Sequence, residues 1–519
     1  MRRVIVIILC LVGCCLAEIR QLTILQSTDI HGVFTPADRS DSSQPGSWLQ
    51  LATVIADQRQ KYGEDQCLLI DCGDTVQGSL TTALSRGEAA IVPLRQLGYD
   101  VWIPGNHELD YGLEQYQRFL ALAGNMALGN NFRVKGQPAP TPWRLFFRNG
   151  IRVAVIGAQA SFTSNWLLPQ YSAQCDIERA ADMLQRVLPD VHRTKPDMIV
   201  LAAHQAWFEF KDSRGVNEIN DIARRFPEID LILGAHSHRL VPGQRIGLKS
   251  WYVQPGCHGA GLGVIQAQVD ISAHRVVDIA SEVVPVGADT PECPQLAQAL
   301  RPWLTRAKEA GRQIVLPALA RPISASGRPG VNCATSELIC QAIADATGAD
   351  AVIHGKLSTK SLDGPAVIIA DLFQLVPYEN NIVLAEVTPD ELAAIVSEQW
   401  TQRDNYRFCG LWGRSCRINS AGKATMVDNA HRSGETGTGN RAPKATAGNV
   451  QAGRLLLAMN SHTAAGSGVL PVLTSIIRAE AARCRDSSIS TRDCVEAFLR
   501  QHPGIVVTPR QWLITGRDH

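Results

Sequence analysis

Polar side chains that can bind metal recur along the first half of the chain, each directly after a short apolar stretch. They stand in the segments "STDIHG", "CGDTVQG", "GNHELD", "LAAHQ" and "GAHSH". Imidazole nitrogens combined with aspartate and asparagine oxygens suit Zn, Mn or Fe better than Ca or Mg. One ion cannot use all of these ligands, whereas two ions that share a bridging carboxylate can. The sequence therefore predicts a site for two divalent metal ions, with the ligands Asp29, His31, Asp74, Asn106, His204, His236 and His238.

The apolar stretches before these residues have the character of buried strands. Examples are "QLTILQS", "CLLID" and "MIVLAA", and between them lie amphipathic segments such as "GSWLQLATVIADQRQKYG", which ends in a glycine. Alternating strands and helices predict an α/β fold, in which ligands bind at the ends of strands. Residues two apart in a strand point the same way. With this spacing Asp29 and His31 can bind one ion together, and so can His236 and His238.

Each motif alone is a weak signal. A single DxH or GNH is usually a turn or a helix cap, and only the joint occurrence of all the motifs at strand ends indicates a metal site. Asp71 and Cys72, which close the apolar run after Cys67, are expected to be structural. Glu108 is expected to begin a helix, where a carboxylate interacts favourably with the helix dipole.

The series DxH, GD, GNH, H and GxHxH resembles the calcineurin-like metallophosphoesterases. The "GNHELD" variant resembles the 5′-nucleotidase branch, which includes bacterial UDP-sugar hydrolase and 2′,3′-cyclic-nucleotide phosphodiesterase. The resemblance covers nearly the whole chain and implies a four-layer α/β/β/α sandwich followed by a smaller α+β domain. It also implies two overlapping ligand sets that share Asp74: one of Asp29, His31, Asp74 and His238, and one of Asp74, Asn106, His204 and His236.

The same resemblance implies a catalytic role for His107, which would reach the phosphoryl oxygen or the leaving group, with Asp110 fixing its orientation. An imidazole without such an anchor has two tautomers and rotates freely. Two divalent ions neutralise the phosphoryl oxygens and activate a water molecule for in-line attack on phosphorus. The expected activity is that of a 5′-nucleotidase-like phosphoester hydrolase with a small-molecule substrate.

Length and composition indicate a two-domain globular protein. The chain has 519 residues and a formal net charge of +1, so its composition gives no reason to expect a nucleic-acid polymer as partner. We expect a leader over residues 1–17, the catalytic domain over 18–288, a Pro-rich linker and connecting helix over 289–315, and a substrate-binding domain over 316–519. The polar, Gly-rich segment 419–450 is predicted to be a loop or hairpin.

The predicted substrate-binding domain departs from the 5′-nucleotidase pattern. Relatives in this branch carry a GGxR-type stretch whose arginine recognises the substrate, whereas this chain has "VIHGKLSTKSL". Lys356 or Lys360 is the candidate replacement, although a lysine cannot reproduce the bidentate contact of a guanidinium.

The aromatic positions of the branch are also altered. Where an aromatic residue and a GGDG-like turn are expected, the chain has His462 and Gly468. Phe408, with Tyr406 and Trp412 nearby, is expected either to stack on a base or to pack in the core. The alternatives to a nucleotidase are therefore a hydrolase of the same fold acting on a non-nucleotide phosphoester or a sulfur ester, and a metal-stabilised binding lipoprotein without turnover.

The first residues resemble an export signal. Arg2 and Arg3 precede "VIVIILCLV", an apolar run too short to span a bilayer but of the length found in signal peptides. Cleavage after Ala17 is one possibility. The other is the lipobox-like "LVGC", in which Cys14 would be acylated and would anchor the protein to the membrane. Both predict an extracytoplasmic protein, in the periplasm or on a membrane.

Cysteine usage is consistent with export, because an oxidising compartment permits disulfides. The close pairs Cys409/Cys416 and Cys484/Cys494 are the expected partners.

Overall fold

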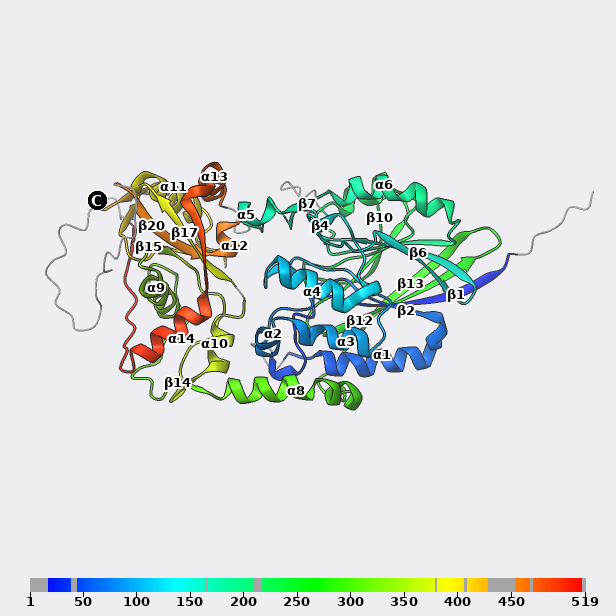
Figure 1. Cartoon of the computed structure of the whole chain (residues 1–519), viewed down its shortest axis with the longest axis horizontal. Helices are drawn as coiled ribbons and strands as arrows, with labels where there is room; N and C mark the ends of the chain where they lie inside the picture. Colours follow the sequence, from blue (N-terminus) through cyan, green and yellow to red (C-terminus); the bar gives the residue numbers. More distant parts are fainter. Residues whose placement is uncertain are drawn as a thin grey trace, which may run out of the picture.

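The computed structural model of the chain describes residues 17–38, 44–163, 166–209, 217–378, 380–405, 408–427, 453–466 and 470–515. Residues 1–16, which include Cys14 and most of the predicted leader, lie outside these ranges. Figure 1 shows two domains side by side, with the long helix α8 (Pro294–Gly311) running along one edge from the first domain to the second. None of the helices within the described ranges is long and apolar enough to cross a membrane.

The first domain contains two β-sheets, and the first has the strand order β13-β12-β1-β2-β3. β1 pairs in parallel with β2, and β2 with β3, so their carboxyl ends lie at one edge of the sheet. The antiparallel strands β12 and β13 complete the sheet. Its strands are β1 (Ile19–Ser27), β2 (Cys67–Asp71), β3 (Val101–Trp102), β12 (Gly261–Asp270) and β13 (Arg275–Pro285).

The second sheet has the order β10-β11-β9-β8-β6-β5. Its four inner strands are parallel, and antiparallel strands form both edges. They are β5 (Trp143–Arg148), β6 (Ile151–Ala158), β8 (Met198–Ala203), β9 (Leu231–Leu233), β10 (Leu240–Ile246) and β11 (Ser250–Pro255).

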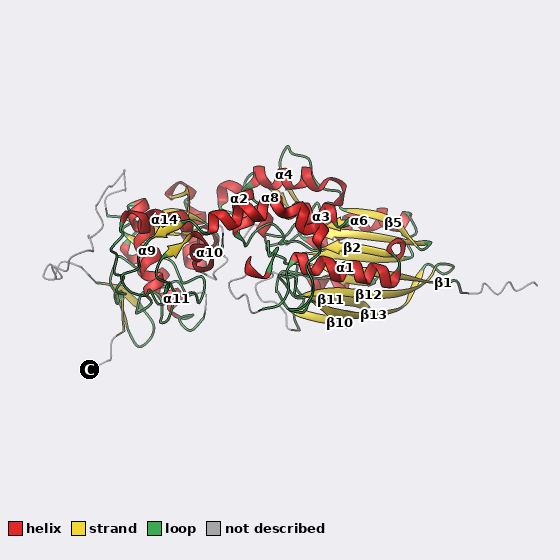
Figure 2. Cartoon of the chain, turned by 90° about the horizontal axis from the view of Figure 1, so that it is seen from below, coloured by secondary structure: helices red, strands yellow, loops and turns green. Residues whose placement is uncertain are grey.

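Helices cover the outer faces of both sheets (Figure 2). One apolar cluster lies between the sheets, where Ile24 and Ile70 meet Val155 and Val200. A second joins the first sheet to α1, α3, α4 and α8, and a third joins the second sheet to α6 and α7. The predicted four-layer α/β/β/α sandwich is therefore confirmed. Its remaining helices are α1 (Trp48–Tyr62), α3 (Ile91–Gln96), α4 (Leu113–Ala123), α6 (Ala180–Arg193) and α7 (Ile219–Arg225).

Local signals mark the ends of α1 as the sequence predicts. The Ser47 hydroxyl accepts a hydrogen bond from the backbone N–H of Gln50 and caps the start of the helix. The helix ends at Gly63, whose φ of 89° favours a residue without a side chain. The chain then turns directly into β2.

The second domain is built on the sheet β15-β20-β17-β21. Helices α9, α10 and α14 pack on one face, and α11 and α13 on the other, which confirms the smaller α+β domain. The sheet consists of β15 (Ala351–Ile353), β17 (Asn381–Val387), β20 (Leu455–Asn460) and β21 (Cys484–Ser490), and the helices are α9 (Ala334–Thr347), α10 (Ile369–Leu375), α11 (Pro389–Trp400), α13 (Pro471–Ala479) and α14 (Thr491–Gln501).

Two small sheets complete the second domain. β14 (Ile314–Leu316) pairs with β16 (Val367–Ile368) directly after α8. β18 (Cys416–Ile418) pairs with β19 (Ala424–Met426) as a hairpin and with β22 (Leu513–Thr515). The hairpin occupies the start of the predicted loop segment 419–450, which the structure describes only as far as Val427.

The domains also meet away from α8. α2 (Leu80–Ser85) packs against α8. A two-stranded sheet is formed by β4 (Phe132–Val134) and β7 (Cys175–Ile177). The short helix α5 (Pro169–Ser172) lies just before β7 in the chain and reaches the second domain. There the Tyr171 hydroxyl donates to the carboxylate of Asp486 at 3.0 Å.

The predicted disulfides do not form, because all cysteines in the described ranges are free thiols. Cys484 and Cys494 belong to different core clusters on the two faces of the sheet. The sulfur of Cys416 faces Met426 at 3.3 Å, while that of Cys409 lies 3.9 Å from the Thr463 hydroxyl. Proximity in sequence was therefore a poor guide to proximity of the sulfur atoms.

Candidate metal centre

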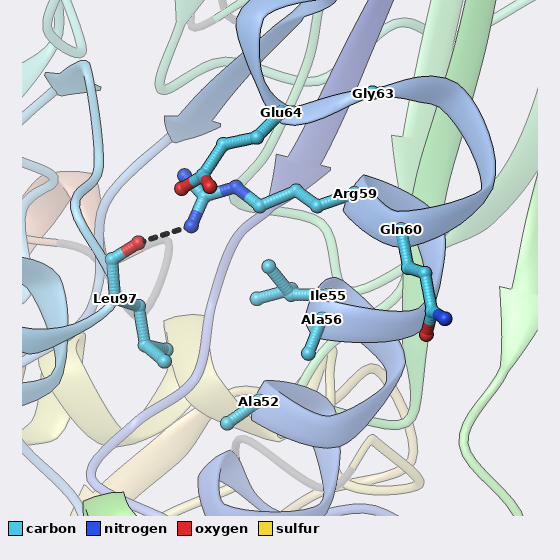
Figure 3. Close-up of a pocket in the computed structure, with 8 residues that line it drawn as sticks. All are labelled: Ala52, Ile55, Ala56, Arg59, Gln60, Gly63, Glu64 and Leu97. Atoms are coloured by element: carbon cyan, nitrogen blue, oxygen red, sulfur yellow. Dashed lines mark hydrogen bonds between the residues drawn. The ribbon is translucent and has the colours of Figure 1, made fainter.

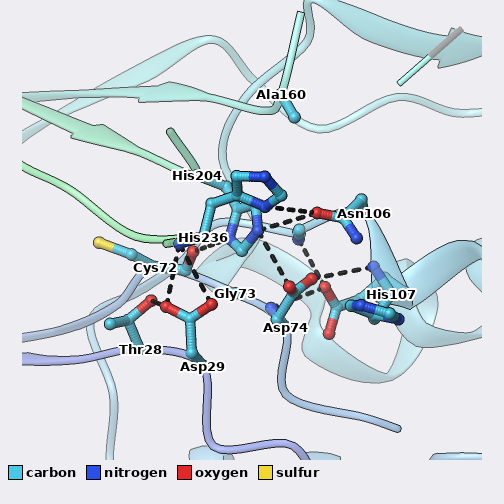
Figure 4. A network of polar contacts seen from close by, with 12 residues as sticks. Thr28, Asp29, Cys72, Gly73, Asp74, Asn106, His107, Ala160, His204 and His236 are labelled. Carbon is cyan, nitrogen blue, oxygen red and sulfur yellow. Dashed lines mark hydrogen bonds and ion pairs between the residues drawn. The ribbon is translucent and has the colours of Figure 1, made fainter. Parts of the chain in front are cut away.

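The loops after β1, β2, β3, β8 and β9 meet at one edge of the sandwich, and all seven predicted ligands lie there (Figure 4 shows part of the cluster). One group consists of Asp29, His31 and His238, whose ligand atoms all lie within 4.8 Å of one another. The Nε2 atoms of His31 and His238 are 3.0 Å apart, and Nε2 of His238 is 3.5 Å from Oδ1 of Asp29.

A second group consists of Asp74, His204 and His236, whose ligand atoms also all lie within 4.8 Å of one another. Nε2 of His204 lies 3.1 Å from Oδ2 of Asp74. Oδ1 of Asn106 completes the group, at 3.2 Å from Nε2 of His204 and 3.1 Å from Nδ1 of His236. Each group therefore brings ligand atoms of mixed type to one point.

Asp74 lies between the groups. The Oδ2 atom that faces His204 is also 3.9 Å from Nε2 of His31. Gly105, which packs against Asp74, is required for this arrangement. A Cβ at this position would come within 2.3 Å of Oδ1 of Asp74 and 2.7 Å of Cε1 of His204. A single carboxylate can thus serve both groups.

The chemistry of these side chains fits divalent cations. Asp29 and Asp74 are buried, and two cations would compensate their charge. Burial lowers the pKa of His31 well below its usual value and lowers the pKa of His236 to about 3. At these two positions the neutral imidazole presents the lone pair that a metal requires.

Backbone carbonyls orient two of the imidazoles. Nδ1 of His204 lies 2.7 Å from the carbonyl oxygen of Cys72, and Nδ1 of His31 lies 3.3 Å from that of Gln77. An N–H at Nδ1 leaves Nε2 as the ligand atom, and such contacts typically fix the tautomer of metal-binding histidines.

Asp29 and His31 fall in one group as predicted, but His236 and His238 fall in different groups, so the prediction for that pair was wrong. β1 ends at Ser27 and β9 at Leu233, so both histidine-containing pairs lie in loops beyond the strands. Most of the ligands adopt the left-handed conformation, which is unfavourable for residues other than glycine. The φ angles are 51° for Asp29, 52° for His31, 54° for Asp74, 72° for His236 and 57° for His238.

Glu108 also differs from expectation, although it does lie in a short 3-10 helix, His107–Leu109. Its carboxylate is buried and accepts hydrogen bonds from the backbone N–H groups of Asp74 at 3.0 Å, Thr75 at 2.7 Å and Val76 at 3.2 Å, and from that of Gly105. Glu108 therefore holds the Asp74 loop in place rather than stabilising the start of its own helix.

Asp71 is structural, as expected. Its buried carboxylate accepts hydrogen bonds from the hydroxyls of Ser27 at 2.6 Å and Thr75 at 2.9 Å. These contacts tie β1 to the loop that carries Asp74.

His107 and Asp110 form a pair beside the ligand groups. Nδ1 of His107 is 2.7 Å from Oδ2 of Asp110, and its backbone N–H donates to Oδ1 of Asp74 at 2.9 Å. Burial alone would lower the pKa of His107, but the carboxylates of Asp110 and Asp74 outweigh burial and raise the pKa to about 10. The side chain is 22% exposed, so the imidazole is accessible from solvent.

The residues predicted in the second domain are engaged elsewhere. The Lys356 ammonium donates to the carbonyl of Ala325 at 3.0 Å, and that of Lys360 lies 3.7 Å from the Asp371 carboxylate. His462 is exposed on α12 (Ser461–Ala464).

The predicted aromatic residues belong to the core. Only 3% of Phe408 is exposed, and its ring packs edge-on against Trp400 at 5.9 Å, so it is not available to stack on a base in this structure. Trp412 is buried and donates to the Glu337 carboxylate at 2.9 Å. Tyr406 and Gly468 lie outside the described ranges.

Tyr378 was missed by the sequence analysis. This residue of the second domain is 42% exposed, and its ring stacks on that of His107, with centroids 6.4 Å apart and planes at 21°. The preceding Pro377 carbonyl accepts a hydrogen bond from the Gln77 side chain of the first domain at 3.0 Å. An aromatic residue in the polar turn "VPYENN" was the available signal.

A separate pocket is lined by residues of α1, by Glu64 and by Leu97 (Figure 3). Arg59 crosses it and donates to the Leu97 carbonyl at 2.6 Å. The pocket adjoins the segments that precede β2 and β3, whereas the metal-ligating groups follow these strands. It is therefore not part of the candidate centre.

Comparison with known families matches both domains. The family of calcineurin-like phosphoesterases matches residues 22–240, and the 5′-nucleotidase C-terminal domain matches residues 311–473. The chain therefore contains a calcineurin-like phosphoesterase domain. This metallophosphoesterase is therefore a metal-dependent phosphoester hydrolase that carries a 5′-nucleotidase-type second domain.

Named relatives agree with this assignment. Protein UshA of Escherichia coli (strain K12) is 24% identical over 425 residues, which cover 72% of this chain and 75% of UshA. The 5′-nucleotidase of Vibrio cholerae is 28% identical over 265 residues, 48% of this chain and 47% of that protein. The metallophosphoesterase thus aligns with about half the length of the Vibrio relative.

Solved structures share the fold over nearly the whole chain. A putative 5′-nucleotidase from Staphylococcus aureus has a TM-score of 0.77 at 18% identity, with 96% of this chain and 100% of that chain covered. The sulfate thiohydrolase SoxB of Thermus thermophilus has a TM-score of 0.62 at 16% identity, with coverages of 96% and 97%. These similarities concern the fold alone.

Proposed function

We propose that this metallophosphoesterase is an extracytoplasmic, dinuclear 5′-nucleotidase-like hydrolase that cleaves a phosphoester by in-line attack of water on phosphorus. The observation that carries the proposal is the placement of Asp74 between two groups of metal-ligating side chains, with His107 beside them.

The two ligand groups would each hold one ion. Asp29, His31 and His238 would bind the first, and Asn106, His204 and His236 the second, with Asp74 shared. When bound, two divalent ions such as Zn, Mn or Fe supply Lewis-acid stabilisation of the phosphoryl oxygens and an activated water.

His107 would act on the same phosphoryl group from the side of the second domain. Its Nδ1–H donates to Asp110, so the Nε2–H of the imidazolium is the donor left for substrate. This N–H would stabilise negative charge on a phosphoryl oxygen or protonate the leaving oxygen. Asp110 is the positioning residue, because it acts only through His107.

Tyr378 supports a substrate that carries a planar base. Its exposed ring comes from the second domain and lies nearly parallel to the His107 ring. Aromatic side chains can stack on any nucleobase, because every base has a π-face. A nucleoside monophosphate would place its phosphate at the metal ions and its base against the second domain.

The altered second domain keeps an alternative open, namely a non-nucleotide phosphoester or a sulfur ester. The segment "VIHGKLSTKSL" lacks the arginine of the family pattern, and the Lys356 ammonium is occupied by a backbone carbonyl. A substrate without a base would not depend on Tyr378.

A substrate screen tests the proposal. The purified chain, loaded separately with Zn, Mn or Fe, is assayed with 5′-AMP, UDP-glucose, 2′,3′-cyclic AMP, bis(p-nitrophenyl) phosphate and a thiosulfate-type ester. We expect 5′-AMP to be the best substrate and two ions to be bound per chain. Turnover of a sulfur ester alone would favour the alternative, and no turnover with any compound or metal would indicate a binding protein.

The extracytoplasmic location is proposed from "VIVIILCLV" after Arg2 and Arg3. Mass spectrometry of the mature amino terminus tests it. Glu18 as the first residue would show soluble export, an acylated Cys14 would show membrane anchoring, and an intact Met1 would contradict both.

A further inference from the structure

A third group of metal-ligating side chains lies next to the two already described. It consists of His238, Cys257 and His258, whose ligand atoms all lie within 4.8 Å of one another. Cys257 and His258 follow β11 in "QPGCHGAG" and belong to neither of the other groups. Only His238 is shared with the proposed dinuclear centre.

The backbone holds this group against the centre. The N–H of His258 donates to the carbonyl of Asp29 at 2.8 Å, and His258 has the left-handed φ of 58°. Its ring meets those of His31 and His238 edge-on, with centroids 5.6 Å apart in both cases. Nδ1 of His258 lies 3.6 Å from the sulfur of Cys257.

The group lies at the rim of the site. The His238 side chain is 41% exposed, whereas that of Asp29, on the inner side, is 0% exposed. Cys257 and His258 are partly exposed as well. An ion can therefore approach this group from solvent without displacing the buried ligands.

We propose that His238, Cys257 and His258 bind an additional soft divalent cation, with Zn²⁺ as the preferred ion, at the mouth of the dinuclear centre. A thiolate and two imidazoles are typical Zn²⁺ ligands, and three protein ligands leave the fourth position of a tetrahedral ion open. Mn²⁺, which prefers oxygen ligands, would occupy the group poorly.

The shared histidine gives the rim ion a regulatory effect. His238 belongs to the buried group with Asp29 and His31 as well as to the rim group, so an ion bound by Cys257 and His258 competes for it. We expect excess Zn²⁺ to slow hydrolysis, while excess Mn²⁺ does not. This effect rests on the proposed dinuclear function, but occupancy of the rim group can be measured without turnover.

Cobalt spectroscopy tests the site, because Co²⁺ replaces Zn²⁺ and a thiolate ligand gives a near-ultraviolet charge-transfer band. The full-length chain is titrated with Co²⁺, and the bound ions are counted by equilibrium dialysis. We expect a third equivalent that binds more weakly than the first two, accompanied by the band, which Zn²⁺ abolishes.

Two variants test the ligands, and a third serves as the control. Cys257→Ser and His258→Asn should each lose the band and the third equivalent but retain two ions and Mn²⁺-supported hydrolysis. Asparagine tolerates the left-handed conformation of His258 and keeps its backbone contact with Asp29. Cys293→Ser, which alters another partly exposed thiol at the start of α8, is the matched control and should behave as the parent chain.

The proposal is overturned if the parent chain binds only two Co²⁺ ions, if the band is absent, or if it persists in Cys257→Ser. Each of these results leaves the dinuclear hydrolase untouched. Loss of hydrolysis with two ions bound would instead contradict the proposed function.

Discussion

The two domains differ in where the backbone adopts unfavourable conformations. In the first domain, left-handed non-glycine residues gather at the metal centre, as at Asp29 and His236. In the second domain, Ser488 is the only non-glycine residue with positive φ within the described ranges. Such conformations persist only where surrounding contacts compensate for them. The difference indicates that the first domain holds the site of the chemistry, whereas the second domain contributes packing and binding contacts.

Asp74→Ala should have the largest effect on the proposed chemistry of the first domain. The change removes the carboxylate shared by both ligand groups and the acceptor of the His107 backbone N–H. Because several electrostatic contacts, each worth roughly 10²–10³ in rate, disappear together, we expect kcat to fall by at least about 10⁴-fold. Metal analysis should show fewer than two ions per chain.

Asp278→Ala is the matched control, since this aspartate is exposed on β13. Its rate and metal content should equal those of the parent chain. Full metal content in Asp74→Ala would contradict the shared-ligand role.

His107→Ala should retain both ions and lose most turnover. Removal of one preorganised donor typically costs about 3–4 kcal/mol of barrier, or roughly 10²–10³ in kcat. Asp110→Asn keeps the shape but not the charge, so it should lower kcat less and move the pH–rate profile to lower pH, because the pKa of His107 falls when its carboxylate partner is lost. Rates like those of the parent chain in His107→Ala would refute the role of the imidazole.

Glu108→Gln tests how the strained loop is held. The amide has an N–H₂ group where the backbone N–H groups of Asp74 and Thr75 need an acceptor. We expect the free energy of unfolding to fall by about 2–3 kcal/mol in urea denaturation. The exposed Glu114→Gln in α4 should change it little, and equal effects in the two variants would remove Glu108 from the support of this loop.

Tyr378→Ala tests whether the second domain contacts the base of the substrate. If its ring stacks on a base, KM for 5′-AMP should rise roughly two- to tenfold, the equivalent of about 0.5–1.5 kcal/mol, while kcat changes little. Phe408→Leu should instead lower stability by about 1 kcal/mol and leave KM unchanged, because Phe408 packs in the core. The reverse pattern would restore Phe408 as the base-stacking residue.

Residue type and position after an apolar strand were sufficient to predict that these seven side chains would lie together at one edge of the sandwich. The conformation was not predictable, because the left-handed turns at His31 and His238 depend on contacts between loops that are distant in sequence. Glu108 shows the same limit: three of its four partners lie more than thirty positions earlier, in the Asp74 loop.

Predictions for the second domain were less successful for a physical reason. Phe408 and Lys356 were chosen by their place in a motif, but burial and nearby carbonyls decide what these side chains contact. Tyr378 belongs to no motif, and its position beside His107 follows only from the packing of the two domains.

Gln77 links the domains through two different atoms. Its carbonyl orients His31, and its side-chain amide holds Pro377. If the second domain moves away, only the amide contact is lost, and the imidazole keeps its anchor. We therefore expect product to depart without loss of the ions, so that one metal loading serves many turnovers.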